Sequence, residues 1–333
     1  MAQRRRSTLV AVAERAGVSI ASVSRVLNDL PASPEVAERV RRAAEELGYV
    51  PDATARSLKA GRTDQIALAV ADVGNPVYVT MMRAVTEALG GTDYRLVLSS
   101  TGNDPAAQID LLASLNQGYA DGLILIPLRV TDELLDAVRR SRLPIVVIGS
   151  LPEDAGTDNV RADSTAGMGL AVEHLVATGR RRIAFLNGPR DTVPGEARRR
   201  GFDDASARLG VEVAGHAEAE DFTHQAGLAP ARELLAAETA PEAIVCANDL
   251  LALAAIKAVR ETGRRVPEDV AVVGMDDSDI AELSDPALTS VDLGAAERAR
   301  VAAELLLDRL RERDLPARRV VVEPSLHARE STR

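Results

Sequence analysis

Ten residues near the start of the chain, Ser19 to Asn28, have the side chains needed to bind a nucleic acid. On a helix, Val23 and Leu27 would share one face and anchor it, and the polar side chains would remain on the other faces. Arg25 can donate two hydrogen bonds to a guanine, whereas hydroxyl and amide side chains suit phosphate oxygens. This profile is typical of a recognition helix, although an ordinary surface helix with several serines would also fit these ten residues.

The sequence contains no arrangement of residues that is typical of catalysis. It has no nucleophile elbow, no glycine-rich phosphate-binding loop and no histidine pair with metal-ligand spacing. The single cysteine, Cys246, excludes an internal disulfide and lies in an apolar stretch, where we expect it to be a small buried side chain. We therefore expect no enzymatic activity, no metal and no cofactor.

The length of 333 residues predicts roughly two domains. No apolar run reaches the roughly 18 residues that a membrane span needs, and the N-terminus lacks the apolar region and cleavage site of a signal peptide. A cytoplasmic protein without a membrane partner is the resulting expectation.

Charge is divided unevenly along the chain. Residues 1–63 hold 11 Arg and Lys against 7 Asp and Glu, whereas the remainder holds 29 against 43. A basic head on an acidic body indicates that only the head approaches a polyanion, although an excess of this size can arise by chance.

Three short helices are expected to position the basic head. Thr8, Ser19 and Ser33 are helix-capping residues that each precede an amphipathic stretch, and Gly17 and Gly48 end the first and third stretches. Two short helices joined by a glycine-containing turn form the outline of a helix-turn-helix, and the third helix completes a small core.

From residue 65 onwards, apolar strands alternate with helical stretches, which favours parallel α/β units. Two halves are discernible, about 64–161 and 163–290. Ligands of such sheets bind at the carboxyl ends of the strands. The predicted strands are 66–70, 95–98, 122–126, 145–148, 183–186, 243–247 and 270–273.

The first 60 residues resemble the DNA-binding headpiece and hinge of the lactose/galactose repressor (LacI/GalR) family at fixed spacing. The matching motifs are Thr8-Leu9, Val12-Ala13, Ala16-Gly17-Val18-Ser19, Val23 to Asn28, Ser33-Pro34, Leu47-Gly48-Tyr49-x-Pro51 and Ala55-Arg56-Ser57-Leu58. Two positions depart from the family pattern: Ala11 stands where Asp is usual and Asp52 where Asn is usual. Asp52 places an acid close to DNA, where it would weaken or retune binding.

The resemblance implies an all-α helix-turn-helix headpiece (1–50), a hinge helix and linker (51–63) and a core (64–333). The core would be an α/β, periplasmic-binding-protein-like pair of lobes, each a parallel-sheet, Rossmann-like subdomain. Lobe one would span about 64–161 plus 291–321, and lobe two about 162–290 plus 322–333. Thr289 to Asp292 would return the chain to lobe one, and Val320 to Glu323 would cross back.

The resemblance also implies the partners: a pseudo-palindromic operator in double-stranded DNA, bound by a homodimer as a repressor. Ile20, Ala21 and Arg25 would face base edges in the major groove, while the hydroxyl and amide residues suit phosphates. The implied DNA-binding residues are Thr8, Ser19, Ile20, Ala21, Ser22, Ser24, Arg25, Asn28, Ala55 and Leu58.

The hinge, Ala53 to Leu58, is too short to be stable as an isolated helix and should fold only when docked or paired. By resemblance, two hinges pair in the minor groove, where Leu58 is an apolar wedge and Ala55 permits close approach of the helices. A plain linker is the alternative.

A small-molecule effector in the cleft between the lobes is the third implied partner. Polar Arg, Asp and Asn side chains beside an aromatic face suit a sugar. The implied effector-binding residues are Tyr78, Asp163, Arg190, Thr192, Arg198, Phe222, Asn248 and Asp276.

Some of these residues have simpler interpretations. Asn248 and Asp276 each follow a strand and would also serve as helix N-caps, and Arg198 would fit a solvated cluster of arginines. For the whole chain, the alternative function is a solute-binding or sensor protein of the same core fold, which would have no use for the headpiece.

Overall fold

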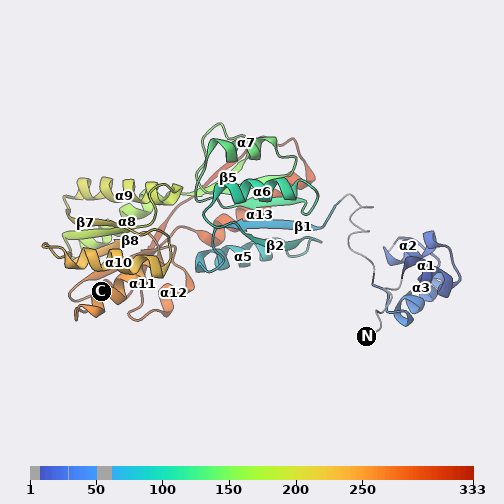
Figure 1. The fold of residues 1–333 in the computed structure, drawn as a ribbon, viewed down its shortest axis with the longest axis horizontal. Helices are drawn as coiled ribbons and strands as arrows, with labels where there is room; N and C mark the ends of the chain where they lie inside the picture. The colour runs from blue at the N-terminus through green and yellow to red at the C-terminus, as the bar shows by residue number, and fades with distance from the viewer. Residues whose placement is uncertain (1–7, 29, 51–61) are drawn as a thin grey trace. The chain divides into compact units, whose positions relative to one another are not determined.

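A computed structural model describes residues 8–28, 30–50 and 62–333 of the chain. The chain divides into a small N-terminal unit that ends at Thr63 and a large unit from Asp64 to Arg333. The predicted hinge helix lies outside the described residues. Figure 1 shows the elements of both units.

Three helices make up the described part of the N-terminal unit. They begin where the sequence predicts, because Thr8, Ser19 and Ser33 each accept a hydrogen bond from a backbone N–H of the first turn. Gly17 adopts the left-handed conformation, with φ at 64°, and turns the chain into the second helix. The helices are α1 (Leu9–Ala16), α2 (Ile20–Leu27) and α3 (Pro34–Glu46).

One valine from each helix, Val12, Val23 and Val40, is fully buried in the core of this unit. The second buried residue of α2 is Val26, whereas Leu27, expected on the anchoring face, is only partly buried. Because residues three apart share a helical face, the buried stripe lies slightly to one side of the predicted one.

The first lobe of the large unit is a parallel sheet with the strand order β11-β5-β4-β3-β1-β2, whose central strands β1, β3 and β4 are buried on both faces. Ile66 and Leu68 pack with α5 and α13, while the alternating Ala67 and Ala69 pack with α6 and α7. The strands are β1 (Gln65–Val70), β2 (Arg95–Ser100), β3 (Gly122–Leu125), β4 (Ile145–Ile148), β5 (Asp158–Ala162) and β11 (Arg319–Val322). The helices are α5 (Pro76–Ala88), α6 (Pro105–Leu115), α7 (Asp132–Arg140) and α13 (Ala295–Arg311).

The second lobe has the strand order β12-β10-β9-β8-β6-β7, with β12 antiparallel to β10. Phe185 and Phe202 stack in its core with ring centroids 4.9 Å apart, and Cys246 is fully buried as expected. The strands are β6 (Arg182–Asn187), β7 (Glu212–Glu218), β8 (Ala243–Cys246), β9 (Ala271–Met275), β10 (Thr289–Asp292) and β12 (Ser325–His327). The helices are α8 (Ser164–Ala177), α9 (Val193–Leu209), α10 (His224–Ala236), α11 (Asp249–Glu261) and α12 (Asp279–Leu283).

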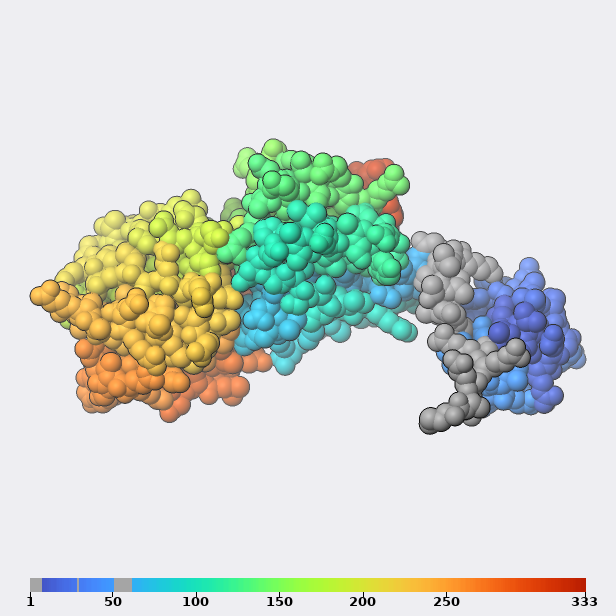
Figure 2. Space-filling view, viewed as in Figure 1, coloured from blue at the N-terminus to red at the C-terminus, as the bar shows by residue number. Residues whose placement is uncertain are grey.

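The chain passes between the lobes after β5, after β10 and after β11. Thr289 to Asp292, expected to return the chain to the first lobe, instead form β10, which pairs with β9 and β12 of the second sheet. The crossing therefore follows Asp292. Figure 2 shows the two lobes as adjoining masses, cyan to green and yellow to orange.

Four strands, β5, β7, β10 and β12, were not among the predicted strands, because polar residues interrupt their apolar pattern. Asp158 opens β5 and is completely buried, which is possible because Arg309 and Arg318 bind its carboxylate at 2.9 Å. The edge strand β7 begins and ends at exposed glutamates, Glu212 and Glu218. No helix within the described ranges is long and apolar enough to cross a membrane.

Candidate functional site

The outer face of α2 carries the side chains predicted to read bases. Ile20 is 48% exposed, and Ala21 and Arg25 are also exposed. Arg39 of α3 donates to the backbone carbonyls of Ala16 and Gly17, at 2.5 and 3.1 Å, and so fixes the turn that precedes α2. Helix α2 therefore exposes one arginine and two apolar side chains, and the turn before it is held in place by Arg39.

The predicted phosphate-binding residues also stabilise the helix ends. The hydroxyl of Ser19 lies 2.9 Å from that of Ser22 and accepts the N–H of Ser22. Asn28 donates from its side-chain amide to the carbonyl of Ser24 at 2.6 Å. Thr8 caps α1 by accepting the N–H of Ala11. Ala55 and Leu58 lie outside the described residues, and their roles remain predictions.

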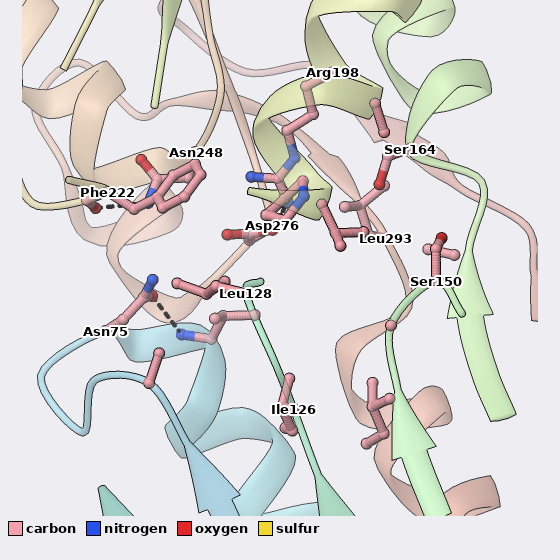
Figure 3. Close-up of a pocket in the computed structure, with 18 of the residues that line it drawn as sticks. Asn75, Ile126, Leu128, Ser150, Ser164, Arg198, Phe222, Asn248, Asp276 and Leu293 are labelled. Atoms are coloured by element: carbon pink, nitrogen blue, oxygen red, sulfur yellow. Dashed lines mark hydrogen bonds and ion pairs between the residues drawn. The ribbon is translucent and has the colours of Figure 1, made fainter. Parts of the chain in front are cut away.

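A cavity of about 190 Å³ lies between the two lobes of the large unit, at the carboxyl ends of their strands. Figure 3 shows side chains of both lobes around it, with Asn75 and Ile126 from the first and Phe222 and Asn248 from the second. Six of the eight predicted effector residues line it: Tyr78, Asp163, Arg198, Phe222, Asn248 and Asp276.

A buried ion pair between Arg198 and Asp276 lies at the centre of the second lobe's wall. Arg198 donates to Oδ1 of Asp276 at 3.2 Å and to the carbonyl of Ala247 at 2.5 Å. Both side chains are less than a tenth exposed, so Arg198 does not belong to a solvated cluster. Burial raises the pKa of the Asp276 carboxyl, while Arg198 and Arg298 act in the opposite direction.

Phe222 supplies an aromatic face beside this ion pair. The guanidinium carbon of Arg198 lies 5.9 Å from the centre of the Phe222 ring, within the range of a cation–π contact. The ring leaves no room for a side chain at Gly188, where a Cβ atom would lie 2.3 Å from it. Glycine at this position therefore sets how far the ring reaches into the cavity.

Asp249 holds the loop that carries Asp276. Asp276 and Asp277 both have positive φ, 100° and 45°, which non-glycine residues rarely adopt. The buried Asp249 carboxylate accepts hydrogen bonds from the N–H and hydroxyl of Ser278, at 2.8 and 2.7 Å, and from the hydroxyl of Ser290 at 2.5 Å. A Cβ atom at Gly274 would lie 2.5 Å from this carboxylate.

Helix capping accounts for part of the role of Asn248 but not of Asp276. Asn248 caps α11 and also donates to the carbonyl of Phe222 at 2.8 Å, a bond marked in Figure 3. Asp163 caps α8 in the same manner. Asp276 caps no helix, because the N-cap of α12 is Ser278.

Tyr78 lies in the wall contributed by the first lobe. It is buried, and burial together with the nearby Asp276 raises the pKa of its hydroxyl, so the phenol is a neutral hydrogen-bonding group.

Arg190 and Thr192 do not line the cavity, contrary to the prediction. Arg190 is 53% exposed and lies 3.5 Å from the carboxylate of Glu218. Thr192 is buried as the N-cap of α9, with its hydroxyl donating to the carbonyl of Pro189 at 2.6 Å. Both residues belong to the turn that starts α9, and the cavity is lined instead by the residues that follow them, Val193 and Pro194.

Arg298 lines the cavity and was missed. It is three residues after Ala295 and four before Ala302, both buried, so it lies on the inward face of α13. An arginine at core spacing in an alanine-rich helix is the signal that would have found it.

Two ion pairs join the lobes outside the cavity lining. Arg129 holds Asp191 through two hydrogen bonds of 2.8 and 2.9 Å, and Arg83 pairs with Asp279 at 3.0 Å. No group of acidic, histidine or cysteine side chains in the described part of the chain has the arrangement of a metal site.

Family models match both parts of the chain. Residues 8–52 match the model for bacterial regulatory proteins of the lacI family, and residues 172–332 match the model for a periplasmic binding protein-like domain.

Relatives that match along nearly the whole chain are named as transcriptional regulators or repressors. The chain is 38% identical to the HTH-type transcriptional regulator CelR of Thermobifida fusca over 341 residues, covering 99% of this chain and 100% of the relative. It is 32% identical to the ribose operon repressor of Escherichia coli (strain K12), covering 98% and 99%. Identity to the HTH-type transcriptional repressor PurR of Photobacterium profundum is 31%, with coverage of 98% and 99%.

Solved structures share the whole fold. The CelR–cellobiose complex superposes with a TM-score of 0.74 at 37% identity, covering 98% of this chain and 100% of that one. The lac repressor dimer bound to operator and the anti-inducer ONPF superposes with a TM-score of 0.86 at 26% identity, covering 98% and 99%.

Proposed function

The chain belongs to the lacI family of bacterial regulatory proteins, and from this premise we propose that it is a transcriptional repressor controlled by a small molecule. It binds a pseudo-palindromic operator as a homodimer. An effector, a sugar, binds in the cavity between the lobes and changes the affinity for the operator.

The exposed face of α2 supports the DNA-binding role. In this proposal Arg25 donates two hydrogen bonds to a guanine, while Ile20 and Ala21 make apolar contacts such as those with a thymine methyl. Few polar side chains reach the bases, so DNA shape carries a larger share of the specificity. Ser22 and Ser24 contact phosphates, which position the helix without specifying a sequence.

A two-fold dimer places two such helices in successive major grooves on one side of the duplex. The hinge, with Ala55 at the helix contact and Leu58 as the wedge, then occupies the minor groove between the half-sites. Residues 1–50, 51–63 and 64–333 form the headpiece, the hinge and the core in this scheme.

The observation that carries the effector role is the chemistry of the cavity. Arg198 and Asp276 offer hydrogen-bond donors and acceptors beside the flat face of Phe222. Sugar hydroxyls need both donors and acceptors, and the C–H face of a sugar ring packs on an aromatic ring. The CelR structure, 37% identical to this chain in sequence, is a complex with cellobiose, so we include disaccharides among the candidate effectors.

Control of DNA binding by the effector follows from the position of the cavity. The cavity lies between two lobes, and the chain passes from one lobe to the other several times. A ligand acts by binding the DNA-competent and the incompetent arrangements of the lobes with different affinity. The short hinge helix is the element that such a shift forms or melts.

Selection of duplexes from a random pool by the full-length chain tests this function. We expect a two-fold symmetric sequence, bound in a saturable manner with affinity that falls as salt rises. Arg25→Ala should lose discrimination between this sequence and single-base variants, while Ser22→Ala should weaken all of them alike. Recovery of no symmetric sequence would overturn the proposal.

A further inference from the structure

Arg298 projects from the buried face of α13 into the cavity, and its charge is not neutralised by a bonded carboxylate. Its Nε atom is buried and donates to no described residue. Asp276 and Asp292 lie close enough to act on its charge, yet neither forms an ion pair with it within the described structure. Burial lowers the pKa of the Arg298 guanidinium, although an arginine stays charged near neutral pH.

Arg198, on the opposite lobe, is bonded differently. It binds both Asp276 and the carbonyl of Ala247, so its charge is compensated by protein groups. A buried guanidinium that lacks such acceptors costs free energy, which a ligand with acceptor oxygens would recover. On the side of the cavity formed by α13, a hydrogen-bond donor therefore remains available for acceptor oxygens of a ligand.

The charges of the cavity wall point to the kind of acceptor. The charged side chains that line the cavity in the described structure are Arg161, Arg198, Arg200 and Arg298, together with Asp72, Asp163, Asp221 and Asp276. Their formal charges balance, but Arg198 is bonded to Asp276, whereas no carboxylate of the described structure is bonded to Arg298, so one guanidinium is available for one negative group on a ligand. A doubly charged phosphate would be repelled more strongly by Asp276 and by the lining residues Asp163 and Asp221.

We propose that Arg298 binds the carboxylate of the effector, and that the effector is therefore a sugar acid rather than a neutral sugar. A planar guanidinium matches a carboxylate through two parallel hydrogen bonds, which adds direction as well as charge. This inference rests on the proposed function, because it takes the cavity to be the effector site.

Such a ligand also connects the two lobes. Its carboxylate binds Arg298, which α13 holds against the first sheet, while its hydroxyls bind Arg198 and Asp276 of the second lobe. A ligand without the carboxylate would not form the contact with Arg298 of the first lobe. Arg298 is thus a specificity-determining residue that couples binding to the closed arrangement.

Calorimetric titration of the full-length chain with matched pairs of probes tests the proposal. The pairs are D-glucuronate with D-glucose, D-galacturonate with D-galactose, and cellobionate with cellobiose. Wild type should bind at least one acid ten-fold or more tightly than its neutral partner. Arg298→Met should reduce that preference to about three-fold or less, whereas Arg298→Lys, which keeps the charge but not the planar fork, should retain part of it.

Arg300→Met is the matched control. Arg300 lies on the same helix but is exposed and bonded to Glu297 and Glu304, outside the cavity, so its loss should leave the preference unchanged. Circular dichroism and operator binding of each variant establish that it is folded.

The proposal is overturned if no acid binds wild type, if the neutral partners bind as well as the acids, or if Arg298→Met keeps the preference. Its failure is distinguishable from failure of the proposed function. If a neutral sugar alters operator affinity, the repressor function is supported and only the proposed contact between Arg298 and a carboxylate is refuted. Absence of operator binding would refute the repressor function whichever sugars bind.

Discussion

Replacing Asp249 by asparagine should abolish a pH dependence of stability that the wild type shows between about pH 4 and pH 7. Burial, together with the charge of Asp276, raises the pKa of the Asp249 carboxyl from 3.8 to about 7, and the hydroxyls of Ser278 and Ser290 only partly oppose this. In this window the folded chain keeps a proton on Asp249 that the unfolded chain has lost. Stability therefore falls as pH rises through the window and is constant above it.

The size of the effect follows from linkage. Each unit of pKa difference corresponds to about 1.4 kcal/mol, so a difference of about three units gives roughly 4 kcal/mol between pH 4 and pH 7. Asparagine keeps the shape and one acceptor for the Ser278 N–H but has no proton to exchange. The free energies of unfolding of wild type and Asp249→Asn should therefore diverge most at the acid end, where the wild type is relatively more stable.

Urea unfolding of the full-length chain, followed by circular dichroism at several pH values, measures this difference, in which the contributions of titrating groups that do not interact with Asp249 cancel. Ser290→Ala is the control: it keeps the carboxyl but removes a hydrogen bond that favours the charged form, so the window should extend upward in pH. A difference between wild type and Asp249→Asn that stays constant from pH 4 to pH 7 would show that folding does not raise the pKa of Asp249.

Three further changes have expected outcomes. Asp191→Asn removes a charge from the partly exposed pair with Arg129, and because such pairs contribute about 1 kcal/mol or less, affinity for a cavity ligand measured by calorimetry should fall no more than about five-fold. Gly188→Ala drives a methyl group into the Phe222 ring, so urea unfolding should show a loss of roughly 1–3 kcal/mol and ligand affinity should fall with it. Val23→Ala removes buried methyl groups from the headpiece core, at a cost of about 2 kcal/mol, so gel shifts should show weaker operator binding while ligand affinity of the core is unchanged.

The sequence was sufficient for the parts of the fold that depend on neighbouring residues. The three headpiece helices begin at Thr8, Ser19 and Ser33 because a capping hydroxyl acts within its own first turn. Apolar strands such as β1 and β8 were predicted because strands buried on both faces read as continuous hydrophobic runs.

What the sequence did not predict depends on partners far away in the chain. The strand β5, which begins at Asp158, was not among the predicted strands, and the two arginine partners of Asp158 lie 151 and 160 residues further on. Arg298 was missed for the same reason: its place opposite Arg198 is set by the chain's return to the first lobe. Arg190 and Thr192 were predicted to contact the effector because they lie close to the end of a strand. That proximity does not decide which side chains of a turn face the ligand.

Control of DNA binding by the cavity is tested most directly by fluorescence anisotropy of the selected operator duplex. The duplex is titrated with wild type and with Asp276→Asn, in the presence and absence of the tightest-binding sugar of the probe panel. The sugar should change the operator affinity of wild type at least five-fold, whereas the variant should bind the duplex as wild type does but no longer respond to the sugar. An equal response of both proteins, or a wild type that binds the sugar without any change in operator affinity, would contradict the claim that the cavity controls DNA binding.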